Sequence, residues 1–188
     1  SNLAGKDIDY ANLELKKLDK RFENLKKIQK VFLNCYYNKP ITNELFIELN
    51  SNKKTDFSRY YYFYASYAVS SGKIDEAKTI VESALELYPR NLLLNQYQID
   101  LNNKKYNNLF DCKKENDVAA EILYITANAL SSQSIYPLSN FYLSLAKYLN
   151  EDFYSFDTLL AENFYKTNNF ASAKKVYRNL RKRGEAFK

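Results

Sequence analysis

Residues 58–91 read SRYYYFYASYAVSSGKIDEAKTIVESALELYPRN and carry the clearest structural pattern in the chain. The pattern predicts two short amphipathic helices that fold back on each other at Gly72 and are closed by Pro89. Small residues such as Ala65 and Ala77 let the two helix backbones approach closely, while larger side chains fill the space on either side. A hairpin of this kind cannot bury its apolar face alone, so it needs neighbours stacked against it.

A similar pattern returns at regular distances along the chain. Ala127 and Ala161 are 34 residues apart, as are Ser139 and Ala173. Ala65 precedes Ala127 by 62 residues, which leaves room for two units, one of them short. We therefore expect four helix pairs, which cover residues 58–91, 92–119, 120–153 and 154–187. The second pair is the least regular, with helices expected at 92–103 and 106–113.

The spacing resembles the tetratricopeptide repeat, in which large and small residues alternate on one helix, alanines follow on the next, and a proline closes the unit. Tyr61, Tyr64 and Ala68 occupy such positions on the first helix, and Val81 and Ala84 on the second. The last two helix pairs are also similar to bacterial proteins with many of these repeats. The resemblance implies an all-α fold, a right-handed superhelical array (an α-solenoid) of antiparallel helix pairs, and a segment of a longer array.

Residues 1–57 are expected to form an N-terminal helical extension and a linker. Apolar residues recur at helical spacing over 7–37, which predicts one long helix. A short helix is predicted at 42–49 with Thr42 as its N-cap, and a polar linker at 50–56. The long helix either packs on the first repeat or serves as a dimerisation arm, and the sequence favours the first interpretation because the apolar stripe is short.

Composition and motifs argue against an enzyme. The 188 residues contain no histidine, no glycine-rich phosphate loop, no Gly-x-Ser-x-Gly elbow and no acidic cluster with metal spacing. We therefore expect no catalytic residue, no cofactor and no metal. Cys35 and Cys112 stand alone in the sequence, and two separate thiols are favoured over a disulfide between them.

Nothing in the sequence selects a cellular compartment. No apolar run is long enough to span a membrane. The chain contains no methionine, so its first residue is not expected to be a native start, and a targeting segment could have preceded it. The bacterial cytoplasm and the periplasm both stay open.

Protein binding is the function class that remains. In the tetratricopeptide family the first helix of each pair lines a concave groove that holds a partner segment, so the resemblance implies a protein or peptide partner. The matching positions are Arg59, Tyr62, Ser66 and Val69 in the first pair, Glu121, Tyr124, Asn128 and Ser131 in the third, and Ser155, Thr158, Glu162 and Tyr165 in the fourth. Tyr62, Tyr124 and Tyr165 form a row of amphipathic rings in the groove, or pack against neighbouring helices instead.

Two alternatives stay open beside peptide binding. The chain can be an assembly element that forms homo-oligomers through its N-terminal helix or its C-terminal end, where Phe187 is expected to be exposed. The net charge of +6 and the basic last helix, with Lys174, Lys175 and Arg178, are the argument for a nucleic-acid partner. Nucleic acid is the weaker alternative, because no aromatic platform accompanies these cations.

Overall fold

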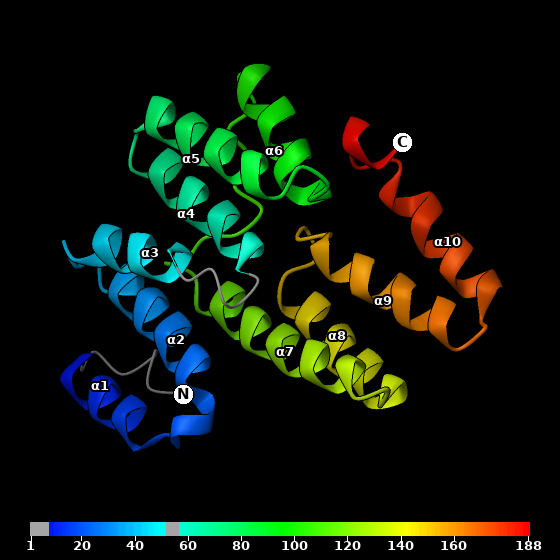
Figure 1. Ribbon diagram of the computed structural model, residues 1–188, viewed down its shortest axis with the longest axis horizontal. Coiled ribbons are helices and arrows are strands. Elements are labelled where there is room, and N and C mark those ends of the chain that lie inside the picture. The colour runs from blue at the N-terminus through cyan, green and yellow to red at the C-terminus, as the bar shows by residue number, and fades with distance from the viewer. Residues whose placement is uncertain (1–7, 52–56) are drawn as a thin grey trace.

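A computed structural model describes residues 8–51 and 57–188 of the chain. These residues form ten α-helices and two short 3-10 helices, and they contain no β-strand (Figure 1). The α-helices are α1 (Ile8–Lys17), α2 (Glu23–Tyr36), α3 (Thr42–Asn50), α4 (Ser58–Ser70), α5 (Ile74–Leu87), α6 (Leu92–Asn102), α7 (Glu115–Ser132), α8 (Tyr136–Leu149), α9 (Ser155–Lys166) and α10 (Phe170–Leu180). The 3-10 helices are η1 (Lys20–Phe22) and η2 (Glu185–Phe187). The predicted all-α fold class is confirmed for this part of the chain.

Five of these helices end in the same backbone turn. α2, α4, α6, α7 and α9 are each followed by a residue with a φ angle between 52° and 76°, namely Asn38, Gly72, Lys104, Ser134 and Asn168. In each turn the N–H of the next residue donates to the carbonyl oxygen five residues earlier, as from Lys73 to Ala68 at 2.9 Å. Successive turn residues are 34, 32, 30 and 34 positions apart. These intervals are close to the 34-residue spacing of the sequence pattern.

The helices on either side of such a turn pack as pairs, α2 with α3, α4 with α5, α7 with α8 and α9 with α10. Ala77 and Ala84 of α5 are fully buried, as are Ser139 and Ala146 of α8. The hydroxyl of Ser139 also donates to the backbone carbonyl of Ala127 at 2.8 Å. The small residues therefore lie where the two helices of a pair meet, as their spacing predicts.

The N-terminal region is two helices instead of one. α1 ends at Lys17, and the carboxylate of Asp19 accepts the backbone N–H of Arg21 at 2.8 Å, which starts η1 ahead of α2. A side chain that competes for backbone hydrogen bonds in this way interrupts a helix. The prediction of one continuous helix over 7–37 is therefore wrong.

The short helix predicted at 42–49 is present as α3. Thr42 is not its N-cap, because the N-cap position belongs to Ile41 and the Thr42 hydroxyl donates to the carbonyl oxygen of Lys39 at 2.7 Å. The predicted linker over 50–56 lies for the most part outside the described residues.

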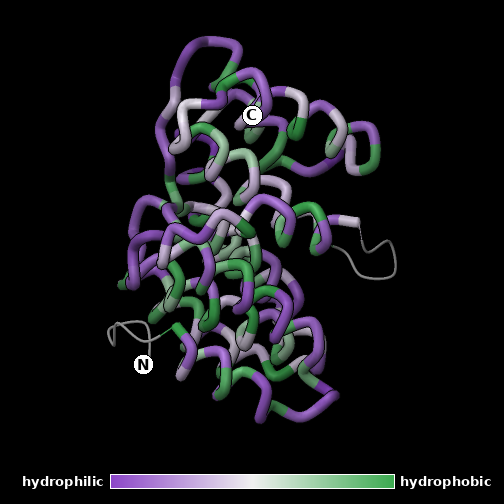
Figure 2. Tube along the Cα trace, turned by 90° about the vertical axis from the view of Figure 1, so that its left-hand side faces the viewer, coloured by the Kyte–Doolittle hydropathy of each residue, from purple (hydrophilic) through white to green (hydrophobic). Residues whose placement is uncertain are grey.

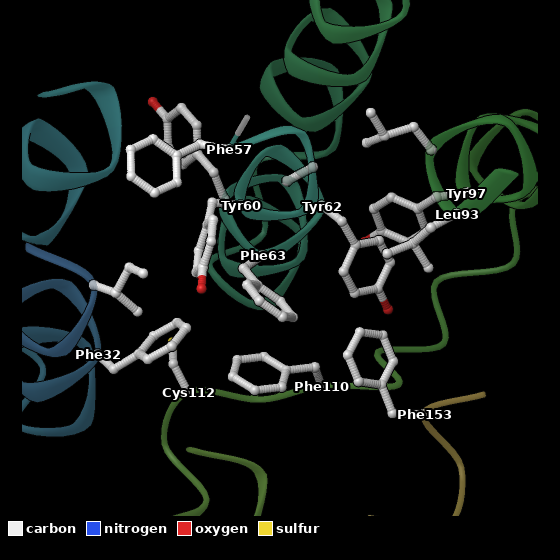
Figure 3. Close-up of a cluster of buried hydrophobic side chains, with 14 of the residues drawn as sticks. Phe32, Phe57, Tyr60, Tyr62, Phe63, Leu93, Tyr97, Phe110, Cys112 and Phe153 are labelled. Carbon is white, nitrogen blue, oxygen red and sulfur yellow. The ribbon is translucent and has the colours of Figure 1, made fainter. Parts of the chain in front are cut away.

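The second predicted pair lacks its second helix. Residues 105–114, called here the crossing segment, are irregular, and α7 begins at Glu115 instead of residue 120. The crossing segment buries Phe110 and Cys112 beside α2 and α4 (Figure 3). The prediction of a helix over 106–113 is therefore wrong. An irregular path lets Phe110 enter the core, and burial of a large ring outweighs one short helix.

The helices form two rows (Figure 1). α1 to α6 pack on one another in chain order, and so do α7 to α10. The contacts between the two rows do not follow chain order. α6, the last helix of the first row, packs against η2 near the C-terminus. Phe187, expected to be exposed, is half-buried with its ring centroid 5.2 Å from that of Tyr154, and the N–H of Ala186 donates to Gln96 Oε1 at 3.0 Å. The prediction of an open C-terminal end is therefore wrong.

An aromatic cluster fills the space where the two rows meet (Figure 3). The ring centroid of Phe63 on α4 lies 4.1 Å from Phe110, 5.6 Å from Phe32 and 5.7 Å from Phe153. Tyr62 closes one side of the cluster and is 5.6 Å from Phe153. Hydrophobic and hydrophilic residues alternate along the helices (Figure 2), so each helix can turn one side to this core. The core thus combines residues from distant parts of the sequence.

Cys35 of α2 and Cys112 of the crossing segment form a disulfide, with Cα atoms 5.8 Å apart. Both side chains are buried. The expectation of two separate thiols is therefore wrong. The two cysteines are 77 positions apart, so their spacing alone could not reveal that the crossing segment brings Cys112 to α2.

Replacing Cys35 by serine should lower the free energy of unfolding by about 2 to 4 kcal/mol. Without the disulfide the unfolded chain is no longer closed into a long loop, so it gains conformational entropy. Urea denaturation under non-reducing conditions measures this loss. Cys112→Ser should have the same effect, and the double variant should lose no more than either single one. A wild-type chain whose stability does not respond to reductant would contradict the pairing.

Candidate interaction surfaces

The face of α4 that was predicted to line an open groove is covered by the chain itself. Tyr62 is 1% exposed, and its hydroxyl oxygen accepts the backbone N–H of Leu109 at 3.3 Å. Ser66 is equally buried and donates to the carbonyl oxygen of Phe110 at 2.9 Å. Val69 is half-buried. The prediction that Tyr62 and Ser66 face an open groove is therefore wrong, because the crossing segment occupies that face.

The crossing segment is held from both rows by hydrogen bonds to its backbone and side chains. The amide of Asn108 donates to the carbonyl oxygen of Ser66 at 3.3 Å, while the amide of Asn150 in the second row donates to the carbonyl oxygen of Leu109 at 2.9 Å. A bound peptide in a helical groove would use the same kinds of contact. Here the ligand-like segment belongs to the same chain.

Arg59, Glu121 and Ser155 occupy equivalent positions of three predicted repeats, and the structure brings them together. Arg59 binds both carboxylate oxygens of Glu121, with Nη2 to Oε2 at 2.7 Å and Nε to Oε1 at 2.9 Å, and it also donates to the Ser155 hydroxyl. Glu121 is 0% exposed and accepts a further hydrogen bond from Tyr60 at 3.3 Å. The three positions therefore share a face, but that face is a buried contact between the rows.

Aromatic rings enclose the Arg59 guanidinium. Its central carbon lies 3.9 Å from the ring centroid of Tyr124 and 4.6 Å from that of Phe153. Burial is the largest single effect on the pKa of Arg59 and lowers it, but the charge and hydrogen bonds of Glu121 together with Tyr124 and Tyr60 outweigh it, so the pKa is raised. Burial also raises the pKa of Glu121, an effect that Arg59 opposes. Arg59 and Tyr124 thus contribute to the contact between the rows. The prediction that Arg59 binds a partner in an open groove is therefore wrong.

Three of the remaining predicted groove residues are exposed on α7 and α9. Asn128, Glu162 and Tyr165 reach the surface, and the ring of Tyr165 lies 5.4 Å from that of Phe170. Ser131, predicted beside them, is buried and donates to Asn163 at 2.6 Å. The tyrosine row is therefore divided, since Tyr62 is buried, Tyr124 is half-buried and Tyr165 is exposed.

The outward face of α8 is a different kind of surface. Four large apolar side chains lie on it in helical register, and all are exposed, up to 79% for Tyr148: Leu138, Phe141, Leu145 and Tyr148. The one charged residue of α8, Lys147, pairs with Asp157 of the same chain at 2.7 Å. We call these four residues the α8 stripe. Its side chains lie outside the contact between α7 and α8, which uses Leu143 and Ala146 instead.

In two other helix pairs, α4 with α5 and α9 with α10, the second helix exposes charged side chains at the surface. On α5 the exposed residues include Asp75, Glu82 and Glu86, and on α10 they include Lys174 and Arg178. A hollow beside α10 is lined largely by basic side chains, namely Lys174, Lys175, Arg178, Arg181, Lys182 and Lys188. Helices in comparable positions are therefore acidic, apolar and basic in turn.

The sequence holds a signal for the α8 stripe that the repeat pattern obscured. From Ile122 to Ala146 the chain contains no charged residue, although 27% of all residues are charged. The repeat spacing places these residues in the pair expected at 120–153 and does not single out the uncharged stretch. Only the structure shows which of them lie outside the packing of that pair.

A pocket of about 370 Å³ lies between α1, α2 and α3. Its apolar lining comes from Leu15, Val31, Leu45 and Leu49, and its rim carries both cations and acids. Lys26 and Glu23 on this rim are 3.7 Å apart. The mixed charge of the rim defines no single ligand class.

Over 8–51 and 57–188, no group of three or more Cys, Asp or Glu side chains is placed to hold a metal ion. No helix in these ranges has the length and apolar character needed to cross a membrane.

Comparison with known proteins does not assign the chain to a family. No family model matches the sequence, and no curated protein is significantly similar to it. The tetratricopeptide resemblance therefore stays a prediction, and the surfaces themselves must carry the functional argument.

Replacing Tyr62 by alanine should lower the free energy of unfolding by about 3 to 5 kcal/mol, because it removes a buried ring from the aromatic cluster. Chemical denaturation measures the loss. The matched control is Tyr165→Ala, whose exposed ring should change stability by no more than about 0.5 kcal/mol. Equal stabilities of the wild type and Tyr62→Ala would mean that the α4 face is open after all.

Proposed function

We propose that the chain is a non-catalytic protein-interaction scaffold that presents the α8 stripe to a protein partner. The observation that carries the proposal is an exposed, uncharged row of Leu138, Phe141, Leu145 and Tyr148 on a chain that is otherwise rich in charge. Exposed apolar patches of this kind mark interaction sites, and aromatic residues are enriched in the buried centres of interfaces.

The interior of the molecule does not need the α8 stripe. The aromatic cluster and the Arg59–Glu121 pair already join the two rows, and the disulfide ties the crossing segment to α2. Solvent-exposed leucine and phenylalanine add little to folding stability, whereas the same side chains covered by a partner contribute about 25 cal/mol for each Å² of apolar area removed from water. The stripe is therefore better explained by binding than by folding.

A helical-repeat scaffold of the tetratricopeptide type is part of this proposal. The recurring helix-ending turns at intervals of 30 to 34 residues support it, as does the burial of small residues within the pairs. The crossing segment departs from that pattern and occupies the α4 face. We therefore place the partner on α8 and not in a groove along α4.

The chemistry that the chain offers supports a non-catalytic role. Without histidine, the side chain that most often moves protons near neutral pH is missing. The acid Glu121 is 0% exposed and is paired with Arg59. Binding therefore explains the exposed features better than catalysis does.

Affinity capture from the source organism tests the proposal. Phe141→Asp combined with Tyr148→Asp should reduce capture of the partner at least about tenfold, because truncated or charged anchor residues at an interface centre cost several kcal/mol. Leu87→Asp is the matched control, since Leu87 on α5 and Phe141 on α8 are both 56% exposed.

Circular dichroism should show the same helix content in all three proteins. Capture that survives the double substitution would contradict the proposed role of α8. Capture lost equally in Leu87→Asp would attribute the effect to added charge and not to the α8 stripe.

A further inference from the structure

We propose that the α8 stripe pairs with the α8 stripe of a second copy of this chain, so that the protein forms a two-fold symmetric dimer. The inference rests on the proposed role of α8 as an interaction face and names the partner of that face. Three features carry it: the spacing of the stripe, its lack of charge, and the contrast with α5 and α10.

The spacing of the stripe is that of a helix that pairs with another helix. Leu138, Phe141, Leu145 and Tyr148 follow one another at intervals of three, four and three residues. Apolar residues at such intervals form a continuous seam along one side of a helix, and side chains of a facing helix can pack between them. A second copy of α8 supplies a seam of the same length and the same spacing.

The lack of charge favours an identical partner. A two-fold contact brings the same surface patch of the two subunits together, so a patch whose unpaired charges all have one sign meets like charges. Each chain carries a net charge of +6, yet the chain from Ile122 to Ala146 carries none, and Lys147 is neutralised by Asp157. Two α8 stripes can therefore meet without placing like charges opposite each other. Such opposed charges would weaken binding.

The comparable helices do not fit self-pairing. Two copies of α10 would bring Lys174, Lys175 and Arg178 against the same cations, and two copies of α5 would oppose Glu82 and Glu86. A strongly charged partner, in turn, would find no countercharge on the α8 stripe. Among these three faces, the charge pattern fits a second copy at α8.

Analytical ultracentrifugation of the purified chain from about 1 to 200 µM covers the range expected for a single pair of helices. The wild type should change from monomer to dimer within this range. Phe141→Asp should weaken the dimer at least about tenfold, whereas Leu87→Asp, with equal exposure on α5, should leave it unchanged.

Cysteine cross-linking tests the geometry. Ser144 is exposed on the flank of the stripe and near its middle, so Ser144→Cys should form a disulfide-linked dimer under mild oxidation. Ser83→Cys, exposed on α5, should stay monomeric under the same conditions. The native Cys35–Cys112 pair is buried and should not take part.

A wild-type chain that stays monomeric over the whole range would overturn the self-pairing. If Phe141→Asp then still lost capture of a different protein, the proposed function would stand without this inference. A wild-type dimer that is insensitive to Phe141→Asp would overturn the α8 interface and point to the N-terminal helices instead.

Discussion

The ion pair between Arg59 and Glu121 is the interaction on which the arrangement of the two helical rows depends. It joins α4 to α7 at a point where the Glu121 side chain is 0% exposed and that of Arg59 only 12%, and Ser155 extends it to α9. Charges are tolerated there because three hydrogen bonds between the two side chains and the enclosing rings replace the lost solvent. If either partner were removed, the other would be left buried and unpaired. The rows therefore have one favoured way to meet.

This contact also decides where a partner can bind. Closing the rows at Arg59 leaves the α4 face against the crossing segment and Phe153, so the surface that a repeat array would offer to a peptide is used within the chain. α8 lies on the far side of its own hairpin from this contact, and its stripe stays exposed. A rigid interior and an uncovered apolar helix are thus two results of the same arrangement.

The repeat spacing predicts what is local in this fold and misses what is distant. Alanine spacing located the hairpins of α4 with α5 and of α9 with α10, because small residues must lie where two neighbouring helices touch. It even placed Arg59, Glu121 and Ser155 on one face. It could not show that the face would close, since this depends on which hairpins meet across 62 and 96 positions of sequence. The disulfide was missed for the same reason. The α8 stripe was missed because helical periodicity alone does not distinguish the buried side of a helix from its exposed side.

A double-mutant cycle on Arg59 and Glu121 tests the central claim most directly. Urea unfolding of the wild type, Arg59→Met, Glu121→Leu and the double variant gives the coupling energy between the two side chains. A buried pair that joins the rows predicts a loss of about 3 to 5 kcal/mol for each single change and a clearly smaller loss for the double variant than the sum of both. Single losses that add to within about 0.5 kcal/mol would contradict the account, because the two residues would then not be in contact.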